Sequence, residues 1–314
     1  MVRLLNLLLA VPADTSFHSW CDRIGIQTPL ARLETTPRSV AGRGVFATDD
    51  IEEGDVAIVI PPQAVLFDKN AAFAYPKLSK RLERRKRRYY NRNKWWNRLL
   101  WRDKIDPECF DPSDFWQAEL TSYIMACIED GEHPWVDWIS QWQRNDPFYR
   151  LLQEGYTWKD EDAIKAVVNE LHAMNPDLPK TKLNAALDLR LRRSDGLQTL
   201  FGLDKSTAAM EGLLCSRAID LDDGITAVIP MFDMINHSQD PNIALIFDGN
   251  NFELRALRPI IKDEELFLCY FGGKPLNEWD EDESVWSIIQ WGIPVRKPKT
   301  STQELTEALT ETLL

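Results

Sequence analysis

Hydrophobic positions follow a strand-like pattern at both ends of the sequence and a helical pattern between them. Near the N-terminus, apolar runs at 45–48 and 56–60 flank a polar, glycine-containing turn at 49–55, which predicts a strand, a turn and a second strand. From about Ala71 onward, apolar residues recur every three to five positions, the spacing of buried helix faces. Short apolar runs return beyond Gly224. The pattern predicts an α+β protein whose strands lie on both sides of a long helical insertion.

The clearest predicted helix covers residues 115–128, where Phe115, Leu120 and Ile124 share one face with other apolar side chains. The tryptophans of 135–142 continue this spacing, and we interpret them as core residues rather than ligand contacts. A segment so long and so periodic is an insertion of helices and not a loop. Further helices are expected at 160–173, 180–193 and 205–217.

The second strand region begins at 226–229 and contains a hairpin signal. Apolar runs at 243–247 and 252–257 flank the sequence Asp-Gly-Asn-Asn at 248–251, and Asp-Gly between alternating strands favours a tight turn. The following segment, 259–268, repeats the turn-then-strand design of the first region. We therefore expect both regions to form one β module that the helices divide in sequence.

The composition suits a globular protein, because 44% of the 314 residues are hydrophobic and 12 of them are tryptophan. Five scattered cysteines without a C-x-x-C pair indicate neither a disulfide framework nor a zinc site, and they favour a reducing compartment. The apolar residues 4–11 resemble a weak signal sequence, but an amphipathic helix or an irregular start fits them better. No other segment approaches the ~20 apolar residues of a membrane span, so no membrane is expected as a partner. His18, His133 and His172 have no His, Cys or carboxylate partner at the spacing of a metal site, so no metal ion is expected either.

Positive charge is concentrated in one segment. Residues 77–104 contain thirteen Lys or Arg against two acidic residues, a local charge of +11 in a chain whose net charge is −12. Aromatic residues, among them Tyr89 and Trp95, alternate with these cations, a mixture that can bind phosphates and stack on bases. A solvated helix face or a nuclear-import signal has the same composition. Contact with nucleic acid or with an acidic protein surface is therefore one of several expectations that the sequence leaves open.

Three motifs combine an apolar strand with polar groups close to its end. The first is Gly42-Arg43-Gly44, which leads into the apolar run to Ala47. The second is Asn236-His237-Ser238, preceded by Asp233, and the third runs from Glu265 to Tyr270. Each is weak alone, because Asn and Ser favour turns and a lone Gly-x-Gly needs a following helix to bind a dinucleotide. Together they suggest one site in an enzyme.

In this order the motifs resemble the cofactor loop, the pseudoknot motif and the catalytic-tyrosine motif of SET-domain protein methyltransferases. The long insertion, Cys215-Ser216-Arg217-Ala218 and Trp291-Gly292-Ile293 are similar to the subgroup named for the Rubisco large-subunit methyltransferase. The resemblance covers about Phe17 to Pro294. It implies a SET-domain β-fold with a pseudoknot, divided into residues 1–72 (N-terminal part), 73–205 (helical insertion), 206–273 (C-terminal part with the pseudoknot) and 274–314 (a helical tail without the subgroup's full C-terminal substrate-binding lobe).

The resemblance also implies roles for single residues. Tyr270 matches the catalytic tyrosine whose phenol faces the transferred methyl group, and Trp291 stands where the subgroup usually has a tyrosine near the cofactor. Glycines in the first motif would let the backbone approach S-adenosylmethionine closely. The implied cofactor-binding residues are Gly42, Arg43, Gly44, Ser216, Asp233, Asn236, His237, Tyr270 and Trp291.

The implied function is that of a protein-lysine N-methyltransferase that uses S-adenosylmethionine and acts on a ribosomal or other non-histone protein. Its expected location is the cytoplasm or nucleus, with an organelle as a further alternative. A histidine acceptor is the first functional alternative, because one branch of the subgroup methylates histidine. A non-catalytic ribosome- or RNA-binding module that uses residues 77–104 is the second, although the presence of Asn236, His237 and Tyr270 argues against it. Substrate recognition is assigned to the helical insertion.

Overall fold

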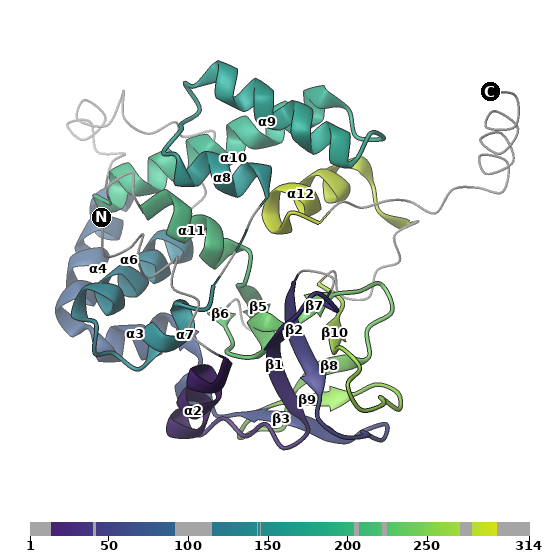
Figure 1. Cartoon of the computed structure of the whole chain (residues 1–314). Coiled ribbons are helices and arrows are strands. Elements are labelled where there is room, and N and C mark those ends of the chain that lie inside the picture. The colour runs from purple at the N-terminus through teal and green to yellow at the C-terminus, as the bar shows by residue number, and fades with distance from the viewer. Residues whose placement is uncertain are drawn as a thin grey trace, which may run out of the picture.

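The computed structural model describes residues 14–39, 42–91, 115–142, 144, 146–203, 207–221, 225–270 and 278–293. Within these ranges, helices form one part of the molecule and small sheets form the other (Figure 1). Helix α12 (Glu281–Trp291) lies near the end of the sequence, yet it packs against α10 (Lys180–Phe201) in the helical part. The α+β class predicted from the sequence is confirmed.

Strands from the two ends of the sequence share the same sheets. β3 (Val56–Ile60) pairs antiparallel with β9 (Phe252–Ala256), and β9 pairs with β8 (Ile243–Phe247) through the expected hairpin. β4 (Leu66–Phe67) pairs antiparallel with β6 (Ile225–Val228). The helices that follow β4 in sequence are therefore inserted into one β module.

Three further pairings complete the described sheets. β1 (Ala31–Thr35) and β2 (Arg43–Ala47) form an antiparallel hairpin. β5 (Ile219–Leu221) pairs antiparallel with β6. β7 (Asn236–His237) and β10 (Phe267–Leu268) pair in parallel, so two segments far apart in the sequence run side by side in the same direction.

Most helices of the helical part were expected from the apolar spacing. None of those described has the length and apolar content that crossing a membrane requires. Besides α10 and α12, they are α3 (Asp68–Ala74), α4 (Pro76–Tyr90), α6 (Phe115–Asp130), α7 (Trp135–Ile139), α8 (Pro147–Gln153), α9 (Glu161–Met174) and α11 (Thr207–Cys215). α2 (Asp14–Ile24) lies beside the sheets, where it packs on β1 and α7 (Figure 1), and short 3-10 turns occur at Pro62–Ala64 and Phe232–Met234.

Several predicted bounds agree with the structure and others do not. The strands expected at 56–60 and 243–247 have the observed bounds of β3 and β8. α10 continues past the expected 180–193 and ends where Gly202 adopts a left-handed conformation, with φ 61°. The pattern gave no prediction for α2 and β1. Residues 4–11 and 92–104 lie outside the described part of the chain.

The segment 259–268 forms less strand than its pattern predicts. Only Phe267 and Leu268 pair in a ladder, whereas Ile260 forms an isolated bridge with Ile51. Asp263, in the middle of the segment, has φ 65°, a conformation that interrupts an extended strand. The polar turn therefore extends further along the chain than the apolar spacing indicates.

A row of buried aromatic rings joins α2 to α7. The ring centroid of Trp20 lies 5.3 Å from that of Phe17 and 6.0 Å from that of Trp138, and Trp138 meets Trp142 edge-on at 5.4 Å. All four side chains are at most 1% exposed. The prediction that the tryptophans of 135–142 belong to the core is confirmed, and burial of such large rings contributes strongly to the stability of this part.

Candidate functional site

The second and third sequence motifs meet because β7 and β10 are neighbours. Asn236 lies opposite Phe267, and His237 lies opposite Leu268. The backbone amide of Ser238 donates to the carbonyl of Leu268 at 2.9 Å and continues the pairing by one residue. The polar residues that follow each apolar strand are therefore brought to one place.

Asn236 connects this pair of strands to the first motif. Its side-chain nitrogen lies 2.8 Å from the carbonyl oxygen of Arg43, 3.0 Å from Ser39 Oγ and 2.6 Å from Glu265 Oε1. These acceptors come from β2, the loop before β2 and the segment before β10. One amide group thus ties all three motifs together, as a buried polar side chain with several partners can.

The two glycines of the first motif serve different purposes. Gly42 has φ 78° and is exposed, so it lets the chain turn from the loop into β2. Gly44 is buried, and a Cβ atom there would lie only 2.1 Å from Glu265 Oε1. The small size of Gly44 therefore admits the Glu265 carboxylate. Close approach of a cofactor to this loop stays a prediction.

His237 and Tyr270 form a contacting pair beside the two strands. Their ring centroids are 5.3 Å apart, and the backbone amide of Tyr270 donates to His237 Nδ1 at 3.2 Å. Burial lowers the pKa of His237, which keeps the imidazole neutral and able to accept this hydrogen bond near pH 7.

The phenol of Tyr270 is held in place and kept protonated. Its hydroxyl donates to the carbonyl of Ile235 at 2.7 Å, and burial raises the pKa of Tyr270 to about 12. The ring of Trp291, at the end of α12, lies 6.1 Å from that of Tyr270. Tyr270 is therefore suited to orient a reacting group by its hydroxyl and unsuited to remove a proton at neutral pH.

A buried ion pair lies close to these residues. Arg217 Nη1 donates to the backbone carbonyl of Asp233 at 2.7 Å and lies 3.7 Å from its Oδ2 atom. Trp138 Nε1 donates to the same carboxylate at 3.1 Å, and the guanidinium of Arg217 lies 5.6 Å from the ring centroid of Trp142. Burial raises the pKa of Asp233 to about 6, although Arg217 and Trp138 oppose this effect.

The carboxylate of Asp233 has no exposed surface, so its described contacts are with the protein. Ser216 precedes Arg217 at the end of α11 and donates its hydroxyl to the carbonyl of Leu213 at 2.8 Å. Of the two residues predicted to line the pocket, Asp233 thus contacts Arg217 and Ser216 precedes it in sequence.

The structure brings most of the predicted site residues into contact. One group joins Arg43, Gly44 and Asn236, and a second joins His237, Tyr270 and Trp291. Sequence reasoning did not select Arg217, Glu265, Ser39 or Trp138. Arg217 and Glu265 stand inside the quoted motifs, so the sequence held a signal for them. Ser39 and Trp138 bond to residues that are 226 and 95 positions away, so no local pattern indicates them.

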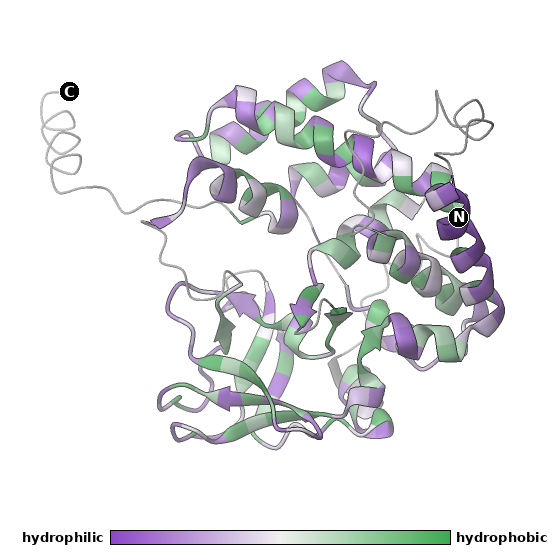
Figure 2. Cartoon of the chain, turned by 180° about the vertical axis from the view of Figure 1, so that it is seen from behind, coloured by the Kyte–Doolittle hydropathy of each residue, from purple (hydrophilic) through white to green (hydrophobic). Residues whose placement is uncertain are grey.

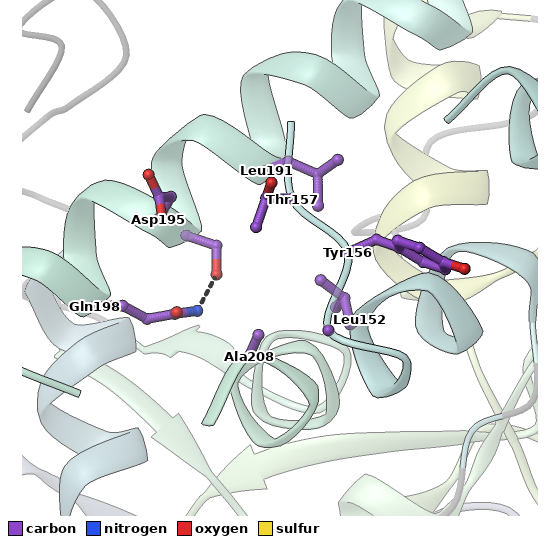
Figure 3. Close-up of a pocket in the computed structure, with 9 residues that line it drawn as sticks. Leu152, Tyr156, Thr157, Leu191, Asp195, Gln198 and Ala208 are labelled. Atoms are coloured by element: carbon purple, nitrogen blue, oxygen red, sulfur yellow. Dashed lines mark hydrogen bonds between the residues drawn. The ribbon is translucent and has the colours of Figure 1, made fainter. Parts of the chain in front are cut away.

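Two hollows of the helical part lie away from these motifs. One, shown in Figure 3, is lined by residues of α8, α10 and α11 and has a volume of about 20 Å³. Gln198 on its wall donates to Ser194 Oγ at 2.9 Å. That volume suits about one water molecule. The other is a surface groove of about 530 Å³ beside Trp158 and Arg192. Within the described ranges, no cluster of three or more His, Cys, Asp or Glu could hold a metal ion.

The family model of the SET domain matches residues 42–271. N-lysine methyltransferase setd6 of Danio rerio is 22% identical over 274 residues, which cover 81% of this chain and 53% of that protein. N-lysine methyltransferase SETD6 of Bos taurus is 25% identical over 260 residues, with the same two coverages of 81% and 53%. The chain therefore spans about half the length of the curated relatives it matches.

Solved structures share the fold at low sequence identity. The SET domain of LSMT bound to lysine and AdoHcy has a TM-score of 0.51 and 17% identity, and the match covers 92% of this chain and 58% of that chain. Rubisco LSMT bound to AdoMet also has a TM-score of 0.51 and 17% identity, with coverages of 92% and 57%. The expected β-fold with a helical insertion is confirmed.

Proposed function

The chain belongs to the SET-domain family, and from that premise we propose that it is an S-adenosylmethionine-dependent protein-lysine N-methyltransferase. The single observation that carries the proposal is the meeting of Asn236, His237 and Tyr270 at the parallel β7–β10 pair. The names of both relatives, N-lysine methyltransferases, support it. So do the AdoMet, AdoHcy and lysine bound to the solved structures of the same fold.

The chemistry of the site residues fits S-adenosylmethionine. Its adenosine and amino groups need neutral hydrogen-bonding partners, which Asn236 and the neutral His237 supply. Its carboxylate needs a cation, and the guanidiniums of Arg43 and Arg217 lie close together, since both approach the sulfur of Met234. We assign the cofactor pocket to Gly42, Arg43, Gly44, Ser216, Asn236, His237, Tyr270 and Trp291, with Asp233 acting through Arg217.

The cofactor would supply a methyl group on a positively charged sulfur: a neutral amine forms a bond to the methyl carbon as the opposite carbon–sulfur bond breaks, and the sulfur leaves as a neutral thioether. A free lysine with a pKa near ~10.4 is neutral only a few times in ~10⁴ at pH 7, so desolvation in an apolar channel has to lower that pKa. Tyr270, whose pKa of about 12 keeps it protonated, orients the amine or the methyl group and leaves proton removal to solvent. Catalysis is then mainly alignment.

A methyl-labelling assay tests the proposal directly. The purified chain is incubated with labelled S-adenosylmethionine and cell extract, and mass spectrometry identifies the labelled residue. We expect methylated lysine. Methylated histidine would select the alternative acceptor, and a wild-type chain that binds cofactor in calorimetry but labels nothing would favour the non-catalytic module.

The exposed side of α4 is the surface that we propose for docking the protein substrate. Figure 2 shows this helix as strongly hydrophilic, and Figure 1 places it on the opposite side of the helical part from α12. Arg85 and Lys86 turn inward: Arg85 donates to the carbonyl of Leu200 at 3.1 Å, and Lys86 pairs with Glu119 at 2.8 Å. The exposed cations are Lys77, Lys80, Arg81, Arg84, Arg87 and Arg88.

These six cations form a stripe about 16 Å long at ~1.5 Å per residue. Exposed aromatic rings flank it, because Phe73 is 91% exposed on α3 and Tyr90 is 59% exposed at the end of α4. An acidic protein surface or RNA bound to the substrate matches this stripe. A ribosomal or other non-histone protein is therefore the substrate class that we propose, with recognition by the insertion 73–205 between the SET parts 1–72 and 206–273.

The compartment is proposed from the thiol groups. Cys21, Cys127, Cys215 and Cys269 are free cysteines, which supports a reducing compartment, the cytoplasm or the nucleus.

A further inference from the structure

Arg144 of the helical insertion contacts two helices that lead into the site. Its guanidinium donates to the carbonyls of Ile289 at 2.6 Å and Gln290 at 2.8 Å in α12, and to that of Gly212 at 3.3 Å in α11. The Arg144 side chain is 6% exposed. The C-terminal end of a helix has unpaired carbonyl groups and a negative dipole, both of which a buried cation stabilises.

Asp146 holds Arg144 in this position. The two side chains form a hydrogen-bonded ion pair, and Asp146 Oδ1 also accepts the backbone amide of Tyr149 at 3.0 Å as the N-cap of α8. Asp146 fits closely against the end of α12 as well, since a Cβ atom on Gly292 would lie 2.9 Å from Asp146 Cβ. Gly292 has φ 70° and ends that helix. The loop before α8 therefore fixes where α12 ends.

Both helix ends continue directly into the site. α12 ends at Trp291, whose ring lies 6.1 Å from that of Tyr270. α11 ends at Cys215 and is followed by Ser216 and Arg217. The side chain of Gln290 donates to the carbonyl of Cys215, which joins the two ends to each other.

We propose that Arg144, held by Asp146, is a positioning residue for the methyl-transfer site and acts through Trp291. The inference rests on the proposed function. Arg144 binds the end of α12, which packs with the helical part, whereas Tyr270 follows β10, so the pair Arg144–Asp146 sets the distance between the rings of Trp291 and Tyr270. Misplacement of a pocket wall by about 1 Å can cost ~100-fold in rate, which is the scale on which such a residue matters.

The test removes both charges together, because a lone buried carboxylate would destabilise the fold by itself. Asn at 146 also keeps the N-cap of α8. For Arg144→Met/Asp146→Asn we expect about tenfold weaker binding of S-adenosylmethionine in titration calorimetry, well below the unfolding temperature, and a lower kcat. The matched control is Arg190→Met/Glu211→Gln, a second buried pair that joins α10 to α11 with side chains 4% and 3% exposed. The control should bind the cofactor as the wild type does, whatever its effect on Tm.

A double-mutant cycle with Trp291→Ala decides whether Arg144 acts through Trp291. In the Trp291→Ala background, removal of the pair should change cofactor affinity by less than about twofold. An equal loss in both backgrounds, or none in the wild-type background, overturns the proposal. If the double variant does not fold, Gly292→Ala displaces the end of α12 while it keeps both charges, and unchanged affinity in that variant overturns the proposal as well. A wild-type chain that binds no cofactor would instead contradict the proposed function.

Discussion

The carboxylate of Glu265 occupies the space that a side chain at Gly44 would need. A Cβ atom at Gly44 would lie 2.1 Å from Glu265 Oε1, and Ser39 and Asn236 donate hydrogen bonds to that same oxygen at 2.8 and 2.6 Å. Glu265 is 7% exposed. Residues of all three sequence motifs thus converge on one buried carboxylate.

Gly44→Ala should destabilise the protein by about 1 to 3 kcal/mol, because the added methyl group has to displace a buried, hydrogen-bonded carboxylate. Urea unfolding measures the loss. In a Glu265→Ala background the same change should cost much less, since the clashing atoms are gone. An equal cost in both backgrounds would show that Gly44 is needed for some other reason. Gly54→Ala, at φ 87° with open space around it, controls for backbone strain.

Tyr270→Phe removes only the hydroxyl that donates to Ile235. We expect turnover to fall by about tenfold or more, with cofactor affinity within about twofold of the wild type, because an interaction needed mainly in the transition state affects kcat. Steady-state kinetics at saturating cofactor and calorimetry give the two values. Equal turnover would remove the role assigned to Tyr270, and Tyr156→Phe, at a ring 40% exposed after α8, is the matched control.

Asp233 should make stability depend on pH. Its pKa is about 6 in the folded protein and ~3.9 in an unfolded chain. The raised pKa therefore stabilises the folded protein fully below about pH 4, where the carboxyl group is protonated in both states. This stabilisation is lost as the pH rises through about 6, because the folded protein then has to ionise a buried carboxyl group. Relative to Asp233→Asn, the wild type should lose on the order of 2–3 kcal/mol between about pH 4 and pH 7.

Urea unfolding of both proteins across this range checks the sign. A difference that stays constant from about pH 4 to pH 7 would mean that folding leaves the pKa of Asp233 unchanged. A difference that grows in favour of the wild type would mean that the pKa of Asp233 is lowered in the folded protein.

Reversal of Arg81, Arg84, Arg87 and Arg88 to Glu should raise the apparent KM for the whole protein substrate and reduce its dependence on salt. Methylation of a short peptide should stay within about twofold, because α4 lies away from β7 and β10, the strands that carry the site (Figure 1). Arg85 is left unchanged, since it donates to Leu200 inside the helical part. The matched control reverses four exposed lysines elsewhere, Lys159, Lys165, Lys180 and Lys262. If both sets have the same effect, α4 contributes only through net charge.

Much of the fold could be predicted because its signals are local. The hairpin of β8 and β9 follows from an Asp-Gly turn between alternating runs, and α6 follows from one apolar face. The segment 259–268 was overestimated as a strand because a positive φ at Asp263 depends on how the turn is packed. The alternation of β1 covers only the five residues Ala31–Thr35, with Ala31 and Leu33 buried, and its pairing with β2 is what makes so short a run a strand.

The sequence by itself determined the three motifs, their order and the family, because each motif is a short run whose residue types are fixed by local chemistry. Only the tertiary structure decided what those residues contact. Asp233 lies in a motif, yet its partners are Trp138, 95 positions away, and Arg217, and burial among them sets its pKa. Arg84 and Arg85 are adjacent in one basic run, yet one is exposed and the other is bonded to Leu200. Periodicity and composition describe each segment alone, whereas burial and electrostatics depend on which distant segments come together.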